Sequence, residues 1–294
     1  MNKEQWYKDL STICDDTEKD SIRKSIDIAS LYLGDVDNVK YELEFGNDYY
    51  VMDNIPIDLE LPEPPLNGLQ PYDKKFVSEL TLSCITGVLG YNIFSYLQEK
   101  KGAFFHDITL VKVLELSKSG NGVVDFSFHT DAAYLKHKFR PEVLSLLCLN
   151  NECNTGTQIV SLDNLIKNIS GKTINVLKSN EFFIKSPDSF EIRKESQTAI
   201  LYENDNRIEI QFSLETTTPL IDNAQKAIVE LTEAANDIAE TLMWKPGNFL
   251  IFNNRRTLHG RRVAEGKSWL QRCYGSRTIS MCSQINLTEG LNHG

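Results

Sequence analysis

From about residue 100 onward, the chain is a succession of short apolar or alternating runs that are broken by turn residues. A period of two is typical of strands with one buried face, and short continuous apolar runs fit strands buried on both faces. These runs lie at 104–113, 123–128, 143–149, 157–162, 180–185, 198–202 and 207–213, and resume at Phe249–Phe252 and from Trp269 to Ile279. Many short strands with few helices predict a mainly β fold, a double-sheet jelly roll.

Helical patterns flank these strands. The first 45 or so residues are polar with apolar positions at helical spacing, which predicts surface helices packed on the core. A second helical pattern covers 73–98, although Gly87 and Gly90 weaken its interior. A third covers 222–243, with Asp222 or Asn223 as its expected cap. We expect one domain over 1–294, with an N-terminal helical extension over 1–45 and a jelly-roll core over 100–280 that carries the helical insert 222–243.

Charge and composition narrow the class of partner. The net charge is −10 and the pI is near 5.1, whereas nucleic acids and anionic membranes require a cationic surface. No window approaches the roughly 18 apolar residues of a membrane-spanning helix, and the N-terminus is polar where a signal peptide would be apolar. The six cysteines form no C-x-x-C pair and are expected to be reduced thiols. We therefore expect a cytoplasmic protein that acts on a small molecule, with no nucleic-acid or membrane partner.

A histidine and a carboxylate stand two residues apart where one of these strands ends. In extended chain, His129 and Asp131 point to the same side, so an imidazole and a carboxylate can meet at one point. The pair alone is weak, because 41 acidic residues among 294 produce about 0.7 such pairs by chance around five histidines. A second histidine, His259, follows the apolar run Phe249–Phe252 and a polar bend. Two histidines and one carboxylate can occupy one face of an octahedral iron(II) and leave positions for dioxygen and a co-substrate.

Basic residues follow His259, namely Arg261, Arg262, Lys267 and Arg272, with Arg277 further on. A dicarboxylate that chelates iron through its oxo-acid end leaves a distal carboxylate, which a planar guanidinium matches in a bidentate manner. Arg272 is the preferred candidate, since it lies on the strand after the loop; Arg261, Arg262 and Arg277 are the alternatives. His106 and His137 lack partners at ligand spacing and are expected to be structural or exposed. Asn253, Asn254, Arg255 and Arg256 could be either turn formers or pocket residues.

An ordered set of segments from about residue 45 to 280 resembles the clavaminate synthase-like branch of the taurine dioxygenase superfamily. The most specific part is Asn253-Asn254-Arg255-Arg256-Thr257-Leu258-His259-Gly260-Arg261 followed by Trp269-Leu270-Gln271-Arg272. The other matching segments are His129-Thr130-Asp131, Pro141–Leu149, Gly156-Thr157 and Pro246–Phe252.

This resemblance implies a double-stranded β-helix with a cupin-like core. It also implies an iron(II)- and 2-oxoglutarate-dependent oxygenase, with iron held by His129, Asp131 and His259. The co-substrate would be held by Arg272, with Thr157 as a hydroxyl partner. Members of this branch typically hydroxylate an unactivated carbon of a free amino acid or a derivative in specialised biosynthesis. Related halogenases replace the metal carboxylate by a small residue, so Asp131 favours hydroxylation.

Three departures bear on the substrate. Several arginine- and asparagine-hydroxylating relatives have glutamate in place of Asp131 and a second, substrate-binding arginine four residues beyond the co-substrate arginine. Here that second position is Ser276, and the nearest arginine is Arg277. Arginine hydroxylases also carry an acidic pair where this chain has Glu215 alone. Glu215 and Arg277 are the candidate substrate residues, and a basic or polar amino acid of the arginine or lysine type is the expected substrate.

Two alternatives of different kinds remain open at this stage. One is an oxygenase that acts on a carrier-bound or peptide-embedded residue, or that desaturates or cyclises its substrate. The other is a non-catalytic small-molecule binding protein on the same fold, against which the intact set of His129, Asp131 and His259 argues.

Overall fold

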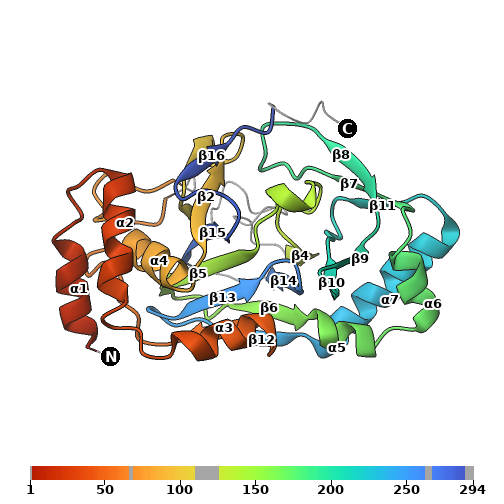
Figure 1. The fold of residues 1–294 in the computed structure, drawn as a ribbon, viewed down its shortest axis with the longest axis horizontal. Helices are drawn as coiled ribbons and strands as arrows, with labels where there is room; N and C mark the ends of the chain where they lie inside the picture. The colour runs from red at the N-terminus through yellow and green to blue at the C-terminus, as the bar shows by residue number, and fades with distance from the viewer. Residues whose placement is uncertain (1, 66–68, 110–125, 262–266, 289–294) are drawn as a thin grey trace.

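The computed structural model describes residues 2–65, 69–109, 126–261 and 267–288, in which two β-sheets face each other and helices cover their outer sides (Figure 1). The larger sheet has the order β1 (Tyr49–Met52), β13 (Phe249–Asn253), β5 (Val143–Asn151), β15 (Ser268–Ser276), β2 (Asn92–Tyr96) and β16 (Ser283–Ile285), and β3 (His106–Thr109) pairs with the first half of β15. The smaller sheet has the order β12 (Glu240–Met243), β6 (Gly156–Ser161), β14 (Thr257–Arg261) and β4 (Phe126–His129). The expected mainly β architecture is confirmed.

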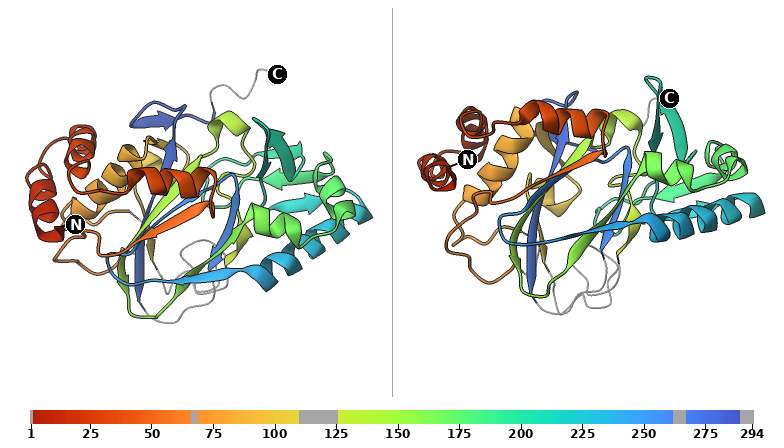
Figure 2. Two further views of the ribbon diagram at one scale, coloured as in Figure 1. Left: turned by 60° about the horizontal axis from the view of Figure 1, so that its bottom comes forward. Right: turned by 90° about the horizontal axis from the view of Figure 1, so that it is seen from below.

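The remaining elements lie around these sheets. A three-stranded sheet contains β11 (Thr217–Pro219), β7 (Phe182–Lys185) and β8 (Glu195–Thr198), and β9 (Leu201–Asn204) pairs with β10 (Arg207–Ile210). The helices are α1 (Lys3–Ser11), α2 (Glu18–Ala29), α3 (Val36–Glu44), α4 (Val77–Val88), α5 (Leu162–Lys167), α6 (Gly171–Leu177) and α7 (Asp222–Ile238), with short 3-10 turns η1 (Lys100–Gly102) and η3 (His137–Phe139). Figure 2 shows α1, α2 and α4 at one end of the molecule and α6 and α7 at the other. No helix in the described ranges is long and apolar enough to cross a membrane.

The alternation of side chains along the strands divides the interior into three apolar layers. On β5, Leu147 and Leu149 pack with the N-terminal helices, whereas Leu144, Leu146 and Cys148 face the space between the two sheets. A third layer, behind the smaller sheet, joins strand residues such as Val160 and Leu258 to α5, α6 and α7. Because both faces of β5 are covered, its sequence is a continuous apolar run rather than an alternating one.

Two of the expected helices are shorter than the sequence pattern indicated. The helix expected over 73–98 ends at Val88, and Gly90 adopts a φ of 95°, a left-handed conformation that favours glycine. The chain then forms β2 against β15. The helix expected over 222–243 ends at Ile238, since Glu240–Met243 hydrogen-bonds along the edge of β6 as β12. The expected cap was also wrong, because Ile221 occupies the N-cap position and Asp222 lies in the first turn.

Most of the expected strands are confirmed, with shifted boundaries. The runs at 143–149, 157–162, 180–185 and 207–213 correspond to β5, β6, β7 and β10. The run at 198–202 instead spans the end of β8, a break and the start of β9. Residues 110–113, 123–125 and Arg262 lie outside the described residues.

A buried group of charges connects the segment before α4 to the larger sheet. Lys74 Nζ lies 2.6 Å from an Asp58 carboxylate oxygen and 2.6 Å from a Glu79 oxygen, and all three side chains are inaccessible to solvent. Glu79 also accepts a hydrogen bond from Gln271 on β15. Burying charges is costly unless oppositely charged groups pair with them, so the single Lys74 ammonium offsets part of the cost of burying the two carboxylates.

We expect Lys74→Met to lower the free energy of unfolding by about 3–5 kcal/mol, because it leaves two buried carboxylates without their cation. Urea denaturation followed by circular dichroism measures this change. Lys267→Met is the matched control, since Lys267 pairs with Glu63 at 2.7 Å on the surface, where both side chains are more than half exposed. Equal stability of the two variants would contradict the compensating role of Lys74.

Candidate metal centre

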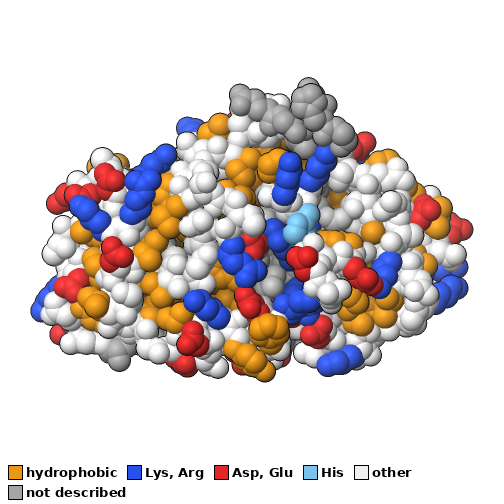
Figure 3. Space-filling model, viewed as in Figure 1, with side chains coloured by type: hydrophobic (Ala, Val, Ile, Leu, Met, Phe, Trp, Pro, Cys, Tyr) orange, Lys and Arg blue, Asp and Glu red, His pale blue; other side chains and the backbone are white. Residues whose placement is uncertain are grey.

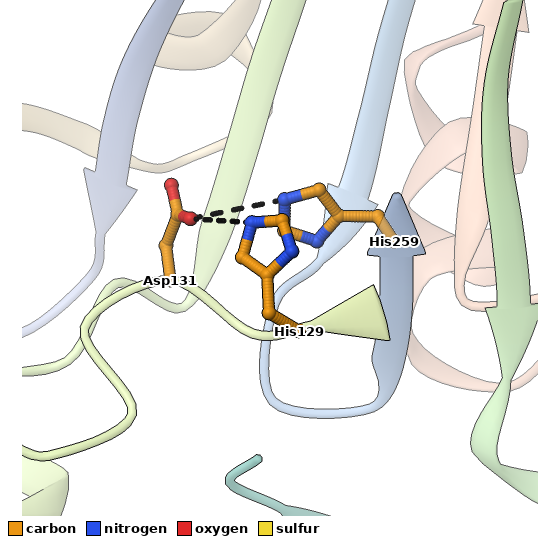
Figure 4. Close-up of side chains that lie close together, drawn as sticks. All are labelled: His129, Asp131 and His259. Atoms are coloured by element: carbon orange, nitrogen blue, oxygen red, sulfur yellow. Dashed lines mark ion pairs between the residues drawn. The ribbon is translucent and has the colours of Figure 1, made fainter. Parts of the chain in front are cut away.

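The smaller sheet brings the two histidines together. Strand β14 lies between β4 and β6, and His259 is the direct antiparallel partner of His129. Side chains of directly opposed residues project from the same face of a sheet, and the two imidazole rings accordingly lie 4.0 Å apart, centroid to centroid. Asp131 follows β4 by two residues and reaches the same point (Figure 4).

The three side chains form a compact set of candidate metal ligands. One ligand atom from each of His129, Asp131 and His259 lies within 4.8 Å of the other two. Asp131 Oδ1 is 3.3 Å from His129 Nε2 and 3.8 Å from His259 Nε2 (Figure 4). Metal–ligand bonds of about 2.1 Å place neighbouring ligands of an octahedral ion roughly 3 Å apart, so the set fits one face of such an ion with small adjustments.

Protonation of the three residues also suits a metal ion. His129 Nδ1 lies 2.9 Å from the Ser127 carbonyl oxygen, to which it donates, so Nε2 carries the lone pair that faces Asp131. Burial lowers the pKa of His259 well below its ordinary value and keeps the ring neutral. Burial alone would raise the pKa of Asp131, but the nearby Arg272 guanidinium outweighs it and holds this pKa far below its usual range. In the described part of the chain, His259 Nδ1 has no hydrogen-bond partner.

The amide side chain of Asn254 holds the backbone of Asp131 on both sides. Asn254 Oδ1 accepts a hydrogen bond of 2.8 Å from the Asp131 N–H, and Asn254 Nδ2 donates one of 3.1 Å to the Asp131 carbonyl. The same Nδ2 lies 3.3 Å from the Pro141 carbonyl. Asn254 is buried, and the next residue after Asp131, Ala132, turns the chain with a φ of 55°. Of the four bend residues whose role was open from sequence, Asn254 is therefore the one that orients a candidate ligand.

Arg272 projects from β15 into the space between the sheets and meets the ligand set. Its Nη1 donates to Asp131 Oδ2 at 2.5 Å, and its Nη2 donates to Glu99 at 3.0 Å. Leu270 and Tyr274, two residues before and after it, belong to the apolar layer between the sheets, as expected for the same face of a strand. Arg272 thus adjoins the candidate metal centre.

Arg277 and Arg261 were other arginines considered as carboxylate-binding residues. The Arg277 guanidinium is held by Glu142 at 2.9 Å and Glu44 at 2.7 Å, and half of its side chain is exposed. The structure does not bring Arg277 to the ligand set, and its substrate role stays a prediction. Arg261 lies two residues beyond His259 on β14 and is buried on the same side of that strand.

Thr157 and Glu215 approach the site from two sides. Thr157 lies on β6, where its Oγ1 accepts a 3.0 Å hydrogen bond from the Trp244 indole, and Ile159, two residues further on, faces the space between the sheets. Glu215 accepts a 2.8 Å hydrogen bond from the hydroxyl of Ser127, the residue whose carbonyl orients His129. The loop that carries Glu215 also forms a β-bridge between Ser213 and His129.

His106 and His137, which were expected from sequence to be structural or exposed, each contact a charged side chain. His106 contacts Arg272, and His137 lies 3.0 Å from Glu209. Neither contact has a local sequence signal, because each partner is more than seventy residues away in the chain. The same is true of Asn254 and Asp131, which are 123 positions apart.

Comparison with known proteins agrees with this geometry. Residues 91–274 match the family model described as "Taurine catabolism dioxygenase TauD, TfdA family". The match covers more than half of the chain, and the protein belongs to this family. It is thus a non-haem iron(II)- and 2-oxoglutarate-dependent oxygenase, and the expected reaction class and family are confirmed.

Individual relatives lie in the amino-acid branch expected from the sequence. The chain is 27% identical to L-asparagine oxygenase of Streptomyces coelicolor over 76% of its own length and 69% of the relative's. It is 25% identical to clavaminate synthase 2 of Streptomyces clavuligerus over 77% of its length and 73% of the relative's. A solved structure of asparagine oxygenase with Fe(II), 2S,3S-3-hydroxyasparagine and succinate superimposes with a TM-score of 0.82 at 22% identity, covering 95% of this chain and 90% of that one. This likeness confirms the jelly-roll fold.

We expect Asn254→Ala to weaken the affinity for Fe(II), or for Co(II) as a spectroscopic substitute, by about 10–100-fold, since outer partners of metal ligands have effects of this size. Titration of the apoprotein under anaerobic conditions measures the dissociation constant directly. Asn253→Ala is the control, because Asn253 contacts the Arg255 N–H and the Leu43 carbonyl rather than Asp131. Unchanged metal affinity in a folded Asn254→Ala variant would show that metal binding does not depend on the two hydrogen bonds from Asn254 to the Asp131 backbone.

Proposed function

We propose that His129, Asp131 and His259 hold iron(II), that Arg272 and Thr157 bind 2-oxoglutarate, and that the protein hydroxylates an unactivated carbon of a free amino acid. The observation that carries this proposal is that ligand atoms of two imidazoles and one carboxylate lie within 4.8 Å of one another at one face of the smaller sheet. This donor set leaves one face of an octahedral ion open for a bidentate co-substrate and dioxygen. When bound, iron(II) supplies the coupling of oxidative decarboxylation of 2-oxoglutarate to insertion of one oxygen atom into a C–H bond.

The residues of this chain orient the reactants and exclude water. Asp131 stays ionised and both imidazoles keep a lone pair for the metal. Arg272 presents a buried guanidinium that matches the distal carboxylate of the co-substrate. Thr157 faces the same interior space and contributes a hydroxyl. Apolar side chains from both sheets enclose the centre, including Phe252, whose ring lies 4.7 Å from that of His259.

Relatives support a polar or basic amino acid as the substrate. They include L-asparagine oxygenase and enduracididine beta-hydroxylase, and a solved structure of the oxygenase OrfP contains Fe and L-Arg. In this chain Glu215 is the acidic residue beside β4 that could meet a cationic side chain of the substrate. Figure 3 shows Lys and Arg interspersed with Asp and Glu on one face, which suits a small molecule better than a polyanion.

A reducing cytoplasmic setting is part of the proposal. All six cysteines are unpaired, as expected where thiols stay reduced. Reduced surroundings also keep iron in the ferrous form that this chemistry requires.

The purified protein, supplied with Fe(II), ascorbate and 2-oxoglutarate, should release succinate when the correct amino acid is added. Mass spectrometry of the proteinogenic amino acids and their ω-amino and guanidino analogues should then identify a product heavier by one oxygen atom.

His129→Ala and Asp131→Gly should each abolish turnover, because each removes a proposed ligand. Full hydroxylation by Asp131→Gly would refute the ligand assignment. Binding of 2-oxoglutarate without turnover of any free amino acid would favour a carrier-bound substrate.

If the substrate is basic, Glu215→Gln should raise its KM by about tenfold, the effect of losing one charge-assisted contact. The KM for 2-oxoglutarate should not change. Steady-state kinetics with Glu203→Gln provide the comparison, since Glu203 is also exposed but pairs with Lys178. An equal KM for the basic amino acid in both variants would remove Glu215 from the substrate site.

A further inference from the structure

The guanidinium of Arg272 is held from behind by a second group of side chains. His106, at the start of β3, is the direct antiparallel partner of Arg272 on β15, so the two side chains share one face of the larger sheet. Arg272 Nη2 lies 2.6 Å from His106 Nδ1 and 3.0 Å from a Glu99 carboxylate oxygen. Glu99 in turn accepts hydrogen bonds of 3.0 and 3.3 Å from the Tyr274 hydroxyl. The guanidinium carbon of Arg272 lies 4.6 Å from the centre of the Tyr274 ring.

The tautomer of His106 suits it to accept a hydrogen bond. Its Nε2 lies 3.2 Å from the Ala103 carbonyl oxygen, which can only accept, so Nε2 carries the proton and Nδ1 offers its lone pair to Arg272. Burial, together with the nearby cations Arg272 and Lys100, lowers the pKa of His106 well below its ordinary value. A neutral ring can accept from a guanidinium, whereas an imidazolium would repel it.

These contacts divide the donors of Arg272 between two sides. Nη2 is directed to His106 and Glu99, and Nη1 is directed to Asp131. In the described part of the chain, the buried Nε–H of Arg272 has no hydrogen-bond partner. A guanidinium fixed through one amino group keeps its plane constant, so the remaining donors meet a carboxylate in a defined orientation.

We propose that His106, with Glu99 and Tyr274, forms a cradle that positions Arg272 for the distal carboxylate of 2-oxoglutarate. This inference rests on the proposed function of Arg272 as the co-substrate anchor. His106 is a positioning residue in this scheme and touches neither the metal ligands nor the substrate. Glu99 pairs with Arg272, and this contact offsets part of the cost of burying the Glu99 carboxylate next to an apolar layer.

The test compares two probes on the anaerobic Fe(II) protein by calorimetric titration. The first probe, 2-oxoglutarate, uses both the oxo-acid end and the distal carboxylate, whereas the second, 2-oxobutanoate, has the same oxo-acid end and no distal carboxylate. His106→Leu should raise the dissociation constant of 2-oxoglutarate by about tenfold or more, as for a lost bond to a charged group, and leave that of 2-oxobutanoate unchanged. His106→Asn, which keeps an acceptor near Nδ1, should restore most of the affinity.

Further variants separate this inference from the proposed function. Failure of the wild-type protein to bind 2-oxoglutarate would refute the proposed function, and unchanged binding by Arg272→Ala would refute the anchor and with it the cradle. Normal binding by His106→Leu, or equal weakening of both probes, would overturn the cradle alone. If His106→Leu does not fold, Tyr274→Phe carries the same test, because it removes the hydroxyl that holds Glu99. His137→Leu is the control, since His137 pairs with Glu209 instead.

Discussion

The antiparallel pairing of β14 with β4 and β6 is the constraint on which the candidate site depends. It places His259 opposite His129, and no local property of either segment could do so, because the residues are 130 positions apart in the chain. A shift of one residue in this register would turn His259 toward the apolar layer behind the sheet, where Leu258 now lies. Such a shift would also turn Arg261 into that layer, and the cost of burying these polar side chains among apolar residues opposes it.

Two groups of buried charged side chains lie on opposite faces of β15. Asp131 and Glu99 both pair with the Arg272 guanidinium between the sheets, so one buried cation is shared by two carboxylates. Lys74, Asp58 and Glu79 form a separate group on the other side of β15. The first group lies beside the ligand set, whereas the second joins the chain before α4 to the sheet. The two groups lie on opposite faces of β15, since the neighbouring residues Arg272 and Gln271 point to opposite sides of the strand.

The pattern of the sequence predicted the strands best where tertiary structure agrees with local preference. The continuous apolar run of β5 and the run of β13 were both recognised, because burial on two faces leaves a strong compositional signal. The segment Glu240–Met243 was instead assigned to the preceding helix. Its backbone hydrogen bonds with β6 decide its conformation, and these come from more than eighty residues away. Similarly, β2 is a strand because β15 offers it a partner.

The sequence by itself determined the chemistry that the site can perform: the two imidazoles, the carboxylate and the guanidinium are residue types, and their order along the chain identifies the family. Only the tertiary structure decided which other side chains support them. Asn254 was one of four polar bend residues, and nothing in the sequence favoured one of them over the others. His106 had no partner at the spacing of a metal-ligand pair. Their roles arise from hydrogen bonds to Asp131 and Arg272, 123 and 166 positions away. Such contacts depend on how the sheets bring distant strands together, and periodicity along the chain carries no record of them.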